Sequence, residues 1–342
     1  MKYLKCILNL VSAMAGSMIF AQSYVALHSN GTVQHFNGAN ALVNAYAASV
    51  NGDTIYLPGG SFAPPANFDK GLTIYGAGHY SDSTQATNKT FIASTVTLNE
   101  NADNFHMEGI EVLGDFIFTS NASVNQVTLK YCKIDGSFSV LGNLTSPSNN
   151  IALIGNVFVG DVVLSNASNV AIYNSILQSH LTNSVANLFY NCIFLFSNPP
   201  YDYLINGEMV NNNLYNSVFF NASWGLYSNI TGNTYKYSIF TTTTPNFGPG
   251  AISENNFFGV PQGSIFVTQT GGAFDYSHNY HLQSPATYLG SDGSQIGLYG
   301  GNHPYKEGAV PSNPHIRQKT ISATTDASGN LNVNIKVAAQ NN

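Results

Sequence analysis

The stretch VAIYNSIL, which begins at Val170, recurs with variations through the middle of the chain. Related copies are VTLKYCKI from Val127, IALIGNVF from Ile151, NLFYNCIF from Asn187, NNLYNSVF from Asn212, NTYKYSIF from Asn233 and ISENNFF from Ile252, with a weaker copy, FHMEGIEV, from Phe105. One position in each copy, here called the marker, is occupied in turn by Ile110, Cys132, Asn156, Ser175, Cys192, Ser217, Ser238 and Asn256. The steps between markers are 22, 24, 19, 17, 25, 21 and 18 residues, so the chain repeats about every 21 residues.

A repeat of this length with apolar residues at alternate positions predicts a solenoid of stacked β-strands. The apolar residues follow a two-residue period, and no helical period of 3.6 residues is present in this region. Leucine-rich repeats have a similar length, but their leucine framework is missing, and a β-sandwich would not repeat one marker over eight coils. A parallel β-helix fits the pattern. Each coil would stack about 4.8 Å above the last, so equivalent residues would form columns along the axis.

Two columns predict how the coils pack. Two residues after the marker lies an apolar column that predicts the core: Ile134, Phe158, Leu177, Phe194, Phe219, Phe240 and Phe258. One residue before the marker lies a polar column, which predicts a ladder of asparagine amides paired with the copies above and below: Asn174, Asn191, Asn216, Tyr237 and Asn255. Cys132 and Cys192 share the marker column three coils apart, about 14 Å at this spacing, whereas a disulfide tolerates about 7 Å. We therefore expect two buried free thiols.

These coils resemble those of the right-handed parallel β-helix superfamily, which includes pectate lyases and polygalacturonases. The stretch ALVNAYAASVNGDTIYLPGGSF from Ala41 resembles the family's entry: a short amphipathic helix, then a first strand that ends in Pro-Gly-Gly. KGLTIYGAG from Lys70 resembles the second coil, and NYHLQSPATYLGSDGSQIGLYGG from Asn279 resembles a closing coil of many secreted bacterial β-helix proteins. The resemblance implies the fold and leaves the activity open, because this fold carries enzymes, adhesins and inert scaffolds.

The predicted fold class is all-β: a right-handed parallel β-helix with a short N-terminal capping helix and a C-terminal β-hairpin. The β-helix with its cap is expected over residues 24–301, and a linker with the hairpin over residues 302–342. In that last part, Lys319–Thr325 and Leu331–Val337 alternate around the turn Asp326–Asn330. We expect this hairpin to pack on the last coil as a cap.

The first 21 residues have the features of a secretory signal peptide. Lys2 and Lys5 precede a mostly apolar stretch, Cys6–Phe20, and cleavage near Ala21 is plausible. The stretch is too short to span a bilayer comfortably and contains polar residues. We therefore expect a secreted protein, extracellular or periplasmic, with no transmembrane segment. No cysteine stands at the expected cleavage site, so lipid attachment there is not supported.

The charge composition restricts the partners. Only 8% of the residues are charged, against about 25% in an average soluble domain. With 11 cations and a net charge of −6, the chain offers no basic stripe for a phosphate backbone, so nucleic acid is excluded as a partner. The coils place Glu108 beside Lys130 and Glu111 beside Lys133, which predicts stacked surface ion pairs. We expect a monomer, no cofactor and no metal.

The resemblance directs the search for catalytic groups. Pectate lyases use calcium and an arginine base, but the only arginine here is Arg317, beyond the coils, and no matching motif surrounds it. Polygalacturonases use aspartates and a Gly-His-Gly motif, for which the nearest text is GAGHY at Gly76. The best acid–base candidates lie five residues after the marker, where one column contains Asp115, Ser137, Asp161 and His180. The candidate catalytic residues are therefore Asp115, Asp161 and His180. The alternative is a polar turn column after glycines.

An outward column suits ligand binding. Tyr173, Tyr190 and Tyr215 lie two residues before the marker on three successive coils and form the candidate ligand-binding residues. Sugar rings stack on such aromatic strips, and neighbouring Asn and Ser supply hydrogen bonds. The alternative is a stabilising ladder covered by residues 197–203 or 241–249.

Three functions remain open from the sequence. The preferred one is a secreted β-helix protein that binds extracellular or cell-surface carbohydrate without identifiable catalysis. The second is a polysaccharide hydrolase or lyase that uses the Asp and His column. The third is a structural or adhesive surface protein.

Overall fold

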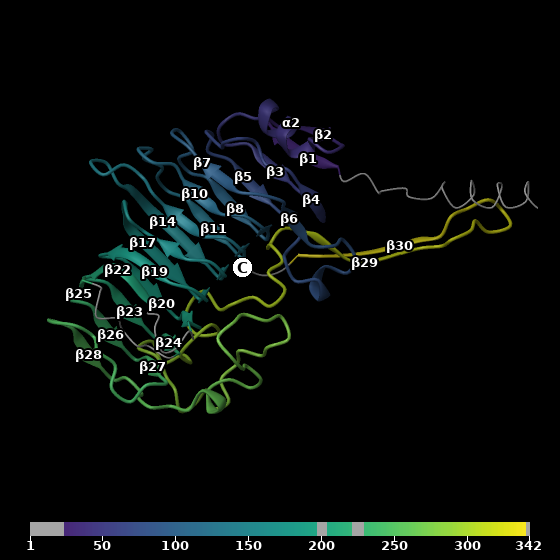
Figure 1. The fold of residues 1–342 in the computed structure, drawn as a ribbon. Coiled ribbons are helices and arrows are strands. Elements are labelled where there is room, and N and C mark those ends of the chain that lie inside the picture. The colour runs from purple at the N-terminus through teal and green to yellow at the C-terminus, as the bar shows by residue number, and fades with distance from the viewer. Residues whose placement is uncertain (1–23, 197–203, 221–228, 340–342) are drawn as a thin grey trace, which may run out of the picture.

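The computed structural model describes residues 24–196, 204–220 and 229–339, and the chain forms a parallel β-helix of about nine turns (Figure 1). Strands of three sheets alternate along the chain, and each coil from β5 to β25 contributes one strand to each sheet, parallel to its neighbours. The predicted signal peptide, residues 1–21, lies outside the described residues. No helix in the described ranges has the length and apolar character that a membrane crossing requires.

Sheet A has twelve strands, sheet B nine and sheet C seven. Sheet A contains β2 (Thr32–Phe36), β1 (Val25–Ser29), β3 (Thr54–Tyr56), β5 (Thr73–Tyr75), β8 (His106–Glu108), β11 (Thr128–Lys130), β14 (Ser148–Ile154), β17 (Ala167–Tyr173), β20 (Leu188–Tyr190), β23 (Asn213–Tyr215), β26 (Thr234–Lys236) and β28 (Ile252–Glu254). Sheet B contains β4 (Gly60–Phe62), β6 (Thr90–Ile92), β9 (Glu111–Val112), β12 (Lys133–Ile134), β15 (Val157–Phe158), β18 (Ile176–Leu177), β21 (Ile193–Phe194), β24 (Val218–Phe219) and β27 (Ile239–Phe240). Sheet C contains β7 (Val96–Leu98), β10 (Phe116–Phe118), β13 (Phe138–Val140), β16 (Val162–Val163), β19 (Leu181–Val185), β22 (Ile205–Val210) and β25 (Asn229–Thr231).

The core follows the predicted apolar column. Ile134 pairs with Phe158 across sheet B, and the same register continues to Phe240. The rings of Phe194, Phe219 and Phe240 stack with centroid distances of 4.5 and 4.7 Å and planes within 9° of parallel. Burial of each such side chain stabilises the fold by roughly 1.5–3 kcal/mol. Phe258 continues the stack, 5.5 Å from Phe240, but remains 44% exposed at the end of the solenoid.

The N-terminal end is covered, as the sequence predicts. Helix α2 (Ala41–Ala48) buries Ala41, Leu42 and Ala45 against the core. The sequence pattern did not predict the antiparallel ribbon of β1 and β2, of which β1 pairs with β3. This ribbon extends sheet A beyond the first coil.

The asparagine column forms, but not as the predicted ladder. Asn174, Asn191 and Asn216 have φ values of 45–56°, a left-handed turn conformation that asparagine tolerates. Their amides turn outward and do not pair with the copies above and below. Asn174 donates to the carbonyls of Leu298 and Gly300 at 2.8 Å. Within the described residues, the buried amide of Asn191 has no hydrogen-bond partner.

The hydrogen-bonded ladder lies instead in the marker column. The side-chain oxygens of markers accept the backbone N–H of the preceding marker: Asn156 from Cys132, Ser175 from Asn156, Ser217 from Cys192, Ser238 from Ser217 and Asn256 from Ser238. A second internal ladder joins Asn187, Asn212 and Asn233, whose side-chain oxygens accept backbone N–H groups in the same way. Buried neutral groups therefore stabilise the turns of successive coils without placing like charges above one another.

The two cysteines confirm the predicted register. Cys132 and Cys192 are both free and fully buried. Burial raises the pKa of each thiol to about 12, so neither is a reactive thiolate at neutral pH.

Beyond β28 the chain leaves the solenoid. Residues 260–312, here called the return segment, run back along the outer face of sheet B, and the short helix η2 (Gln262–Ser264) lies near their start. Along the way Ser291 contacts Asn216, Leu298 contacts Asn174, and Gly308 approaches Gly78. Asn279–Gly301 therefore forms no closing coil, which its resemblance to such coils had suggested. The return segment joins the last coils to the first.

The C-terminal hairpin forms at the opposite end from the one expected. Strands β29 (His315–Ile321) and β30 (Val333–Ala338) pair antiparallel. Their base lies near the first coils, where His315 and Arg317 line a hollow with Asp82 and Ser83 of the region around η1 (Asp82–Thr84). The hairpin then projects away from the solenoid (Figure 1). It does not cap the last coil, because the return segment has carried the chain back to the N-terminal end.

The structure differs in two ways from the surface ion pairs that the sequence predicts. Glu111 does pair with Lys133 at 2.9 Å, and also with Lys89 at 2.5 Å, but its side chain is buried. Those two hydrogen bonds outweigh burial and lower the pKa of Glu111. Glu108 is also buried; it contacts His106 and the backbone N–H of Ser312, and it forms no ion pair with Lys130 in the described structure.

Candidate functional site

The predicted acid–base column forms where sheet C begins. The register of β10, β13, β16 and β19 places Asp115, Ser137, Asp161 and His180 on successive coils. Asp161 and His180 meet directly, with His180 Nδ1 3.0 Å from Asp161 Oδ1. The same oxygen accepts the Ser179 hydroxyl at 2.5 Å and the backbone N–H of His180 at 3.1 Å. Asp115 lies two coils away, about 10 Å at the usual strand spacing.

The electrostatics of Asp161 favour a carboxylate over an acid. Burial alone would raise its pKa, but the hydrogen bonds from Ser179 and His180 dominate and lower the pKa of this carboxyl. A general acid needs the opposite shift, because it must retain its proton near neutral pH. Asp115 accepts the backbone N–H of Ser137 at 2.7 Å, so its oxygen also fixes the next turn. Asp161 is therefore suited to act as a base, and Asp115 to cap a turn. The two carboxyls are less suited to act as a general acid paired with a general base.

The predicted tyrosine column lies on the outer face of sheet A. Tyr173, Tyr190 and Tyr215 are register partners on β17, β20 and β23, and all three are half-buried. Their rings do not form the flat strip expected from the sequence. Tyr173 and Tyr190 are tilted by 54° at 6.4 Å, and Tyr190 and Tyr215 stand edge to face at 86° and 6.3 Å. Alternating ring orientations make a corrugated aromatic surface, because each neighbour meets the ring at a different angle.

The return segment borders these tyrosines on one side. Tyr190 Oη lies 3.1 Å from the Ser291 hydroxyl, and the His303 ring lies 5.3 Å from Tyr173. Of the two loops expected as covers, residues 197–203 lie outside the described residues. The other, residues 241–249, turns Phe247 inward against Tyr235, 4.4 Å away.

A second aromatic group on the same face escaped the sequence analysis. The register of sheet A places Tyr56 and Tyr75 in one column, the one that continues through Glu108 and Lys130 to Tyr173. Tyr56 stacks on Tyr75 at 5.5 Å, and the His28 ring lies 4.8 Å from Tyr56. The sequence contained a signal for this aromatic group, because the tripeptide TIY recurs at Thr54 and Thr73 and marks equivalent strands.

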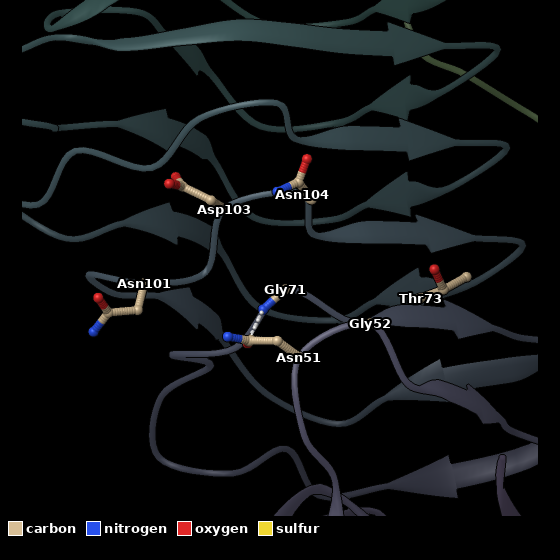
Figure 2. A pocket seen from close by; sticks show the side chains of 7 residues that line it. All are labelled: Asn51, Gly52, Gly71, Thr73, Asn101, Asp103 and Asn104. Carbon is tan, nitrogen blue, oxygen red and sulfur yellow. Dashed lines mark hydrogen bonds between the residues drawn. The ribbon is translucent and has the colours of Figure 1, made fainter. Parts of the chain in front are cut away.

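A polar pocket opens at the start of β5, the strand that also carries Tyr75 (Figure 2). Its volume is about 620 Å³, and it is lined by Asn51, Gly52, Gly71, Thr73, Asn101, Asp103 and Asn104. These residues come from the turns and strand starts that lead into β3, β5 and β8, so Thr73 lies two residues before Tyr75. Asn51 Oδ1 accepts the backbone N–H of Gly71 at 3.0 Å, which orients the amide at the pocket wall. Amides, a hydroxyl and a carboxylate provide both donors and acceptors there.

The geometry gives no further support for a metal site or for a lyase reaction. The described residues contain no group of three or more His, Cys, Asp or Glu side chains placed to hold a metal ion. Arg317 lies on β29 of the hairpin, where it lines a hollow with Asp82 and Ser83 and not with Asp115 or Asp161. His79, of the GAGHY text, is fully buried against Tyr276, 3.1 Å from its hydroxyl.

Comparison of the chain with models of known protein families finds no match, and comparison with curated proteins finds no similar sequence. The class of the protein is assigned from its structure alone: it is a parallel β-helix.

Proposed function

We propose that this protein binds extracellular or cell-surface carbohydrate along the outer face of sheet A. One observation carries the proposal: a single register column of that face holds five tyrosines, Tyr56, Tyr75, Tyr173, Tyr190 and Tyr215, all half-buried. Half-buried rings are anchored on one side and accessible on the other. Such surfaces suit the apolar faces of sugar rings.

The chemistry around the column favours a neutral or weakly acidic glycan. The polar pocket at the start of β5 offers the amides of Asn51 and Asn104, which can donate to and accept from hydroxyl groups. Only two cations of the column, Lys130 and Lys236, face this side, and Lys236 is paired with Glu254 at 2.7 Å. A strongly acidic polymer would need more paired cations than this face supplies.

We further propose that the chain belongs to the pectin lyase-like superfamily and that it acts outside the cytoplasm. The parallel β-helix and the entry motif at Ala41 support the first proposal. The charged start and apolar stretch of residues 1–21 support the second. Amino-terminal sequencing of the secreted protein tests this location, and we expect a new N-terminus near Gln22.

The test of binding is a panel of neutral and acidic polysaccharides, with retention of the protein and release of sugar ends measured together. Retention without release is expected. Tyr190→Ala should weaken retention about tenfold, whereas Tyr190→Phe, which keeps the ring, should preserve it. Absence of retention on every polysaccharide would leave the structural or adhesive alternative.

A polysaccharide hydrolase is the second candidate, favoured by the direct contact of Asp161 with His180. In that case sugar ends should appear in the same panel, and Asp161→Asn should abolish them. Unchanged release in Asp161→Asn would exclude Asp161 from the reaction, because an amide cannot act as a base.

A further inference from the structure

The projecting hairpin has an uncovered apolar face. Val333, Ile335 and Val337 alternate along β30 and are 49–61% exposed, and Ile321 on β29 pairs with Val333. Lys319 pairs with Ile335 on the same face. An isolated two-stranded ribbon is marginally stable in water and gains stability when its apolar face is covered. The hairpin therefore has the composition of an element that docks against another surface.

The hairpin also differs in charge from the rest of the chain. Residues 315–338 contain three cations, Arg317, Lys319 and Lys336, and one carboxylate, Asp326. Residues 24–314 contain six cations and 16 carboxylates. A basic hairpin thus projects from an acidic body, and the body of a second copy has complementary charge.

The last coil of the solenoid offers a matching surface. Ile252 on β28, Phe258 and Leu289 are each 44–47% exposed, and β28 ends sheet A with one unpaired edge in the described structure. A hollow of about 380 Å³ lies beside it, lined by Tyr237, Asn255, Asn256, Phe257, Thr287 and Leu289. The exposed carboxylate of Glu254 stands on the same strand. An exposed edge strand with apolar neighbours is a site for strand addition.

The hairpin cannot reach this surface in its own molecule. Its base lies at the first coils, where Ser312 contacts Glu108 of β8. From β8 to β28 sheet A advances seven strands, about 34 Å along the axis, whereas the nine residues that follow Ser312, up to Ile321 at the far end of the apolar face, extend only about 31 Å. The hairpin moreover points away from the coils (Figure 1). Contact between the two surfaces therefore requires two molecules.

We propose that the β29–β30 hairpin of one copy caps the open last coil of a second copy. The apolar residues of β30 would cover Ile252 and Phe258, a hairpin edge would pair with β28, and Lys319 would approach Glu254. Because the two contact surfaces differ, the arrangement is head-to-tail, and it extends into rings or filaments. This proposal departs from the sequence-based expectation of a monomer and implies an assembly that depends on concentration and salt.

The test measures molar mass by light scattering across protein concentrations. Wild type should associate, and added salt should weaken association, since basic and acidic surfaces meet. Ile335→Asp on the hairpin and Ile252→Asp on the last coil should each reduce association about tenfold or more. Circular dichroism of both variants checks that the solenoid is intact. A wild type that stays monomeric at every concentration would overturn the proposal.

Mixing the two variants separates this interface from others. Each mixed pair retains one intact hairpin and one intact last coil, so the mixture should form one-to-one dimers that do not extend. If Ile252→Asp associates as well as wild type, the hairpin docks elsewhere and the proposal fails. In addition, Lys319→Glu should weaken association, and Glu254→Lys in the partner should restore it.

Discussion

The outer faces of sheets A and B differ although both belong to the same coils. From β15 to β27 the outward residues of sheet B are apolar and buried: Val157, Ile176, Ile193, Val218 and Ile239 form one cluster with Ile265, Phe266, Leu282 and Leu298 of the return segment. Outward residues of sheet A are more polar: threonine, tyrosine, histidine and charged residues predominate, with a few aliphatic residues such as Ile154 and Leu188 among them, and most are half-buried. A solenoid can thus assign one face to its own stability and leave another for partners. The chemical character of the outward residues on each strand distinguishes the covered face from the face left for partners.

The largest expected effect concerns the covered face. Val218→Asp would place a carboxylate between sheet B and the return segment, and we expect a loss of about 4 kcal/mol or more in unfolding free energy. Thr128→Asp, outward on sheet A, is the matched control and should cost about 1 kcal/mol or less. Urea unfolding measures both. Equal losses would mean that the return segment does not seal sheet B.

Acid sensitivity should also originate under the return segment. Burial, with help from nearby Lys133 and Lys89, lowers the pKa of His79 to about 3 from 6.5. The unfolded chain then binds the proton first, so stability is full above pH 6.5 and falls as the pH decreases toward 3. The loss is about 1.4 kcal/mol per pH unit.

The measurement is the unfolding free energy of wild type and His79→Gln between neutral pH and about pH 4. His79→Gln should show a flatter profile in that range and a parallel profile above pH 7. A slope unchanged by the substitution would contradict a buried neutral imidazole.

A smaller effect is expected where the return segment approaches the asparagine column. A Cβ at Gly301 would lie 2.4 Å from Asn191 Nδ2, and the φ of Gly301 is +70°. Gly329 has a φ of +81° with nothing within 4 Å, so Gly329→Ala should cost only the backbone penalty of about 1 kcal/mol. Gly301→Ala should cost about 2–3 kcal/mol, since it adds a steric clash. Thermal unfolding compares them, and equal costs would show that the clash relaxes freely.

The smallest effect sharpens the comparison within sheet A. Tyr75→Ala and Tyr190→Ala remove one ring from the N-terminal and the C-terminal tyrosine group, and each should weaken glycan binding about tenfold, or about 1.4 kcal/mol. Neither should change the unfolding free energy as much as Val218→Asp. Isothermal titration with a retained glycan measures this, and a loss confined to one variant would restrict binding to that end of the face.

The features that depend only on register, that is, on the number of residues per coil, could be predicted from the sequence. Column arithmetic placed Cys132 and Cys192 in separate buried positions and brought Asp161 beside His180, because both follow from counting residues per coil. It failed where orientation matters. The left-handed turn at Asn191 directs the amide outward, and no residue count gives the 86° angle between Tyr190 and Tyr215.

The return segment could not be predicted for a different reason. Its contacts join residues far apart in sequence, such as Ser291 with Asn216 and Leu298 with Asn174, and it has no repeat of its own. The apolar outward residues of sheet B were nevertheless a signal. A strand that is apolar on both faces must be covered on both.

The return segment also changes how the solenoid should unfold. Stacked coils that touch only their neighbours can melt one at a time from either end. A strap that links the coil of Asn216 with those of Asn174 and Gly78 makes that fraying costly, since the first coil to open must also release the strap. The strap is synthesised after every coil that it binds. Coils made before the return segment lack these contacts, so we expect the molecule to unfold as one cooperative unit only when the return segment is in place.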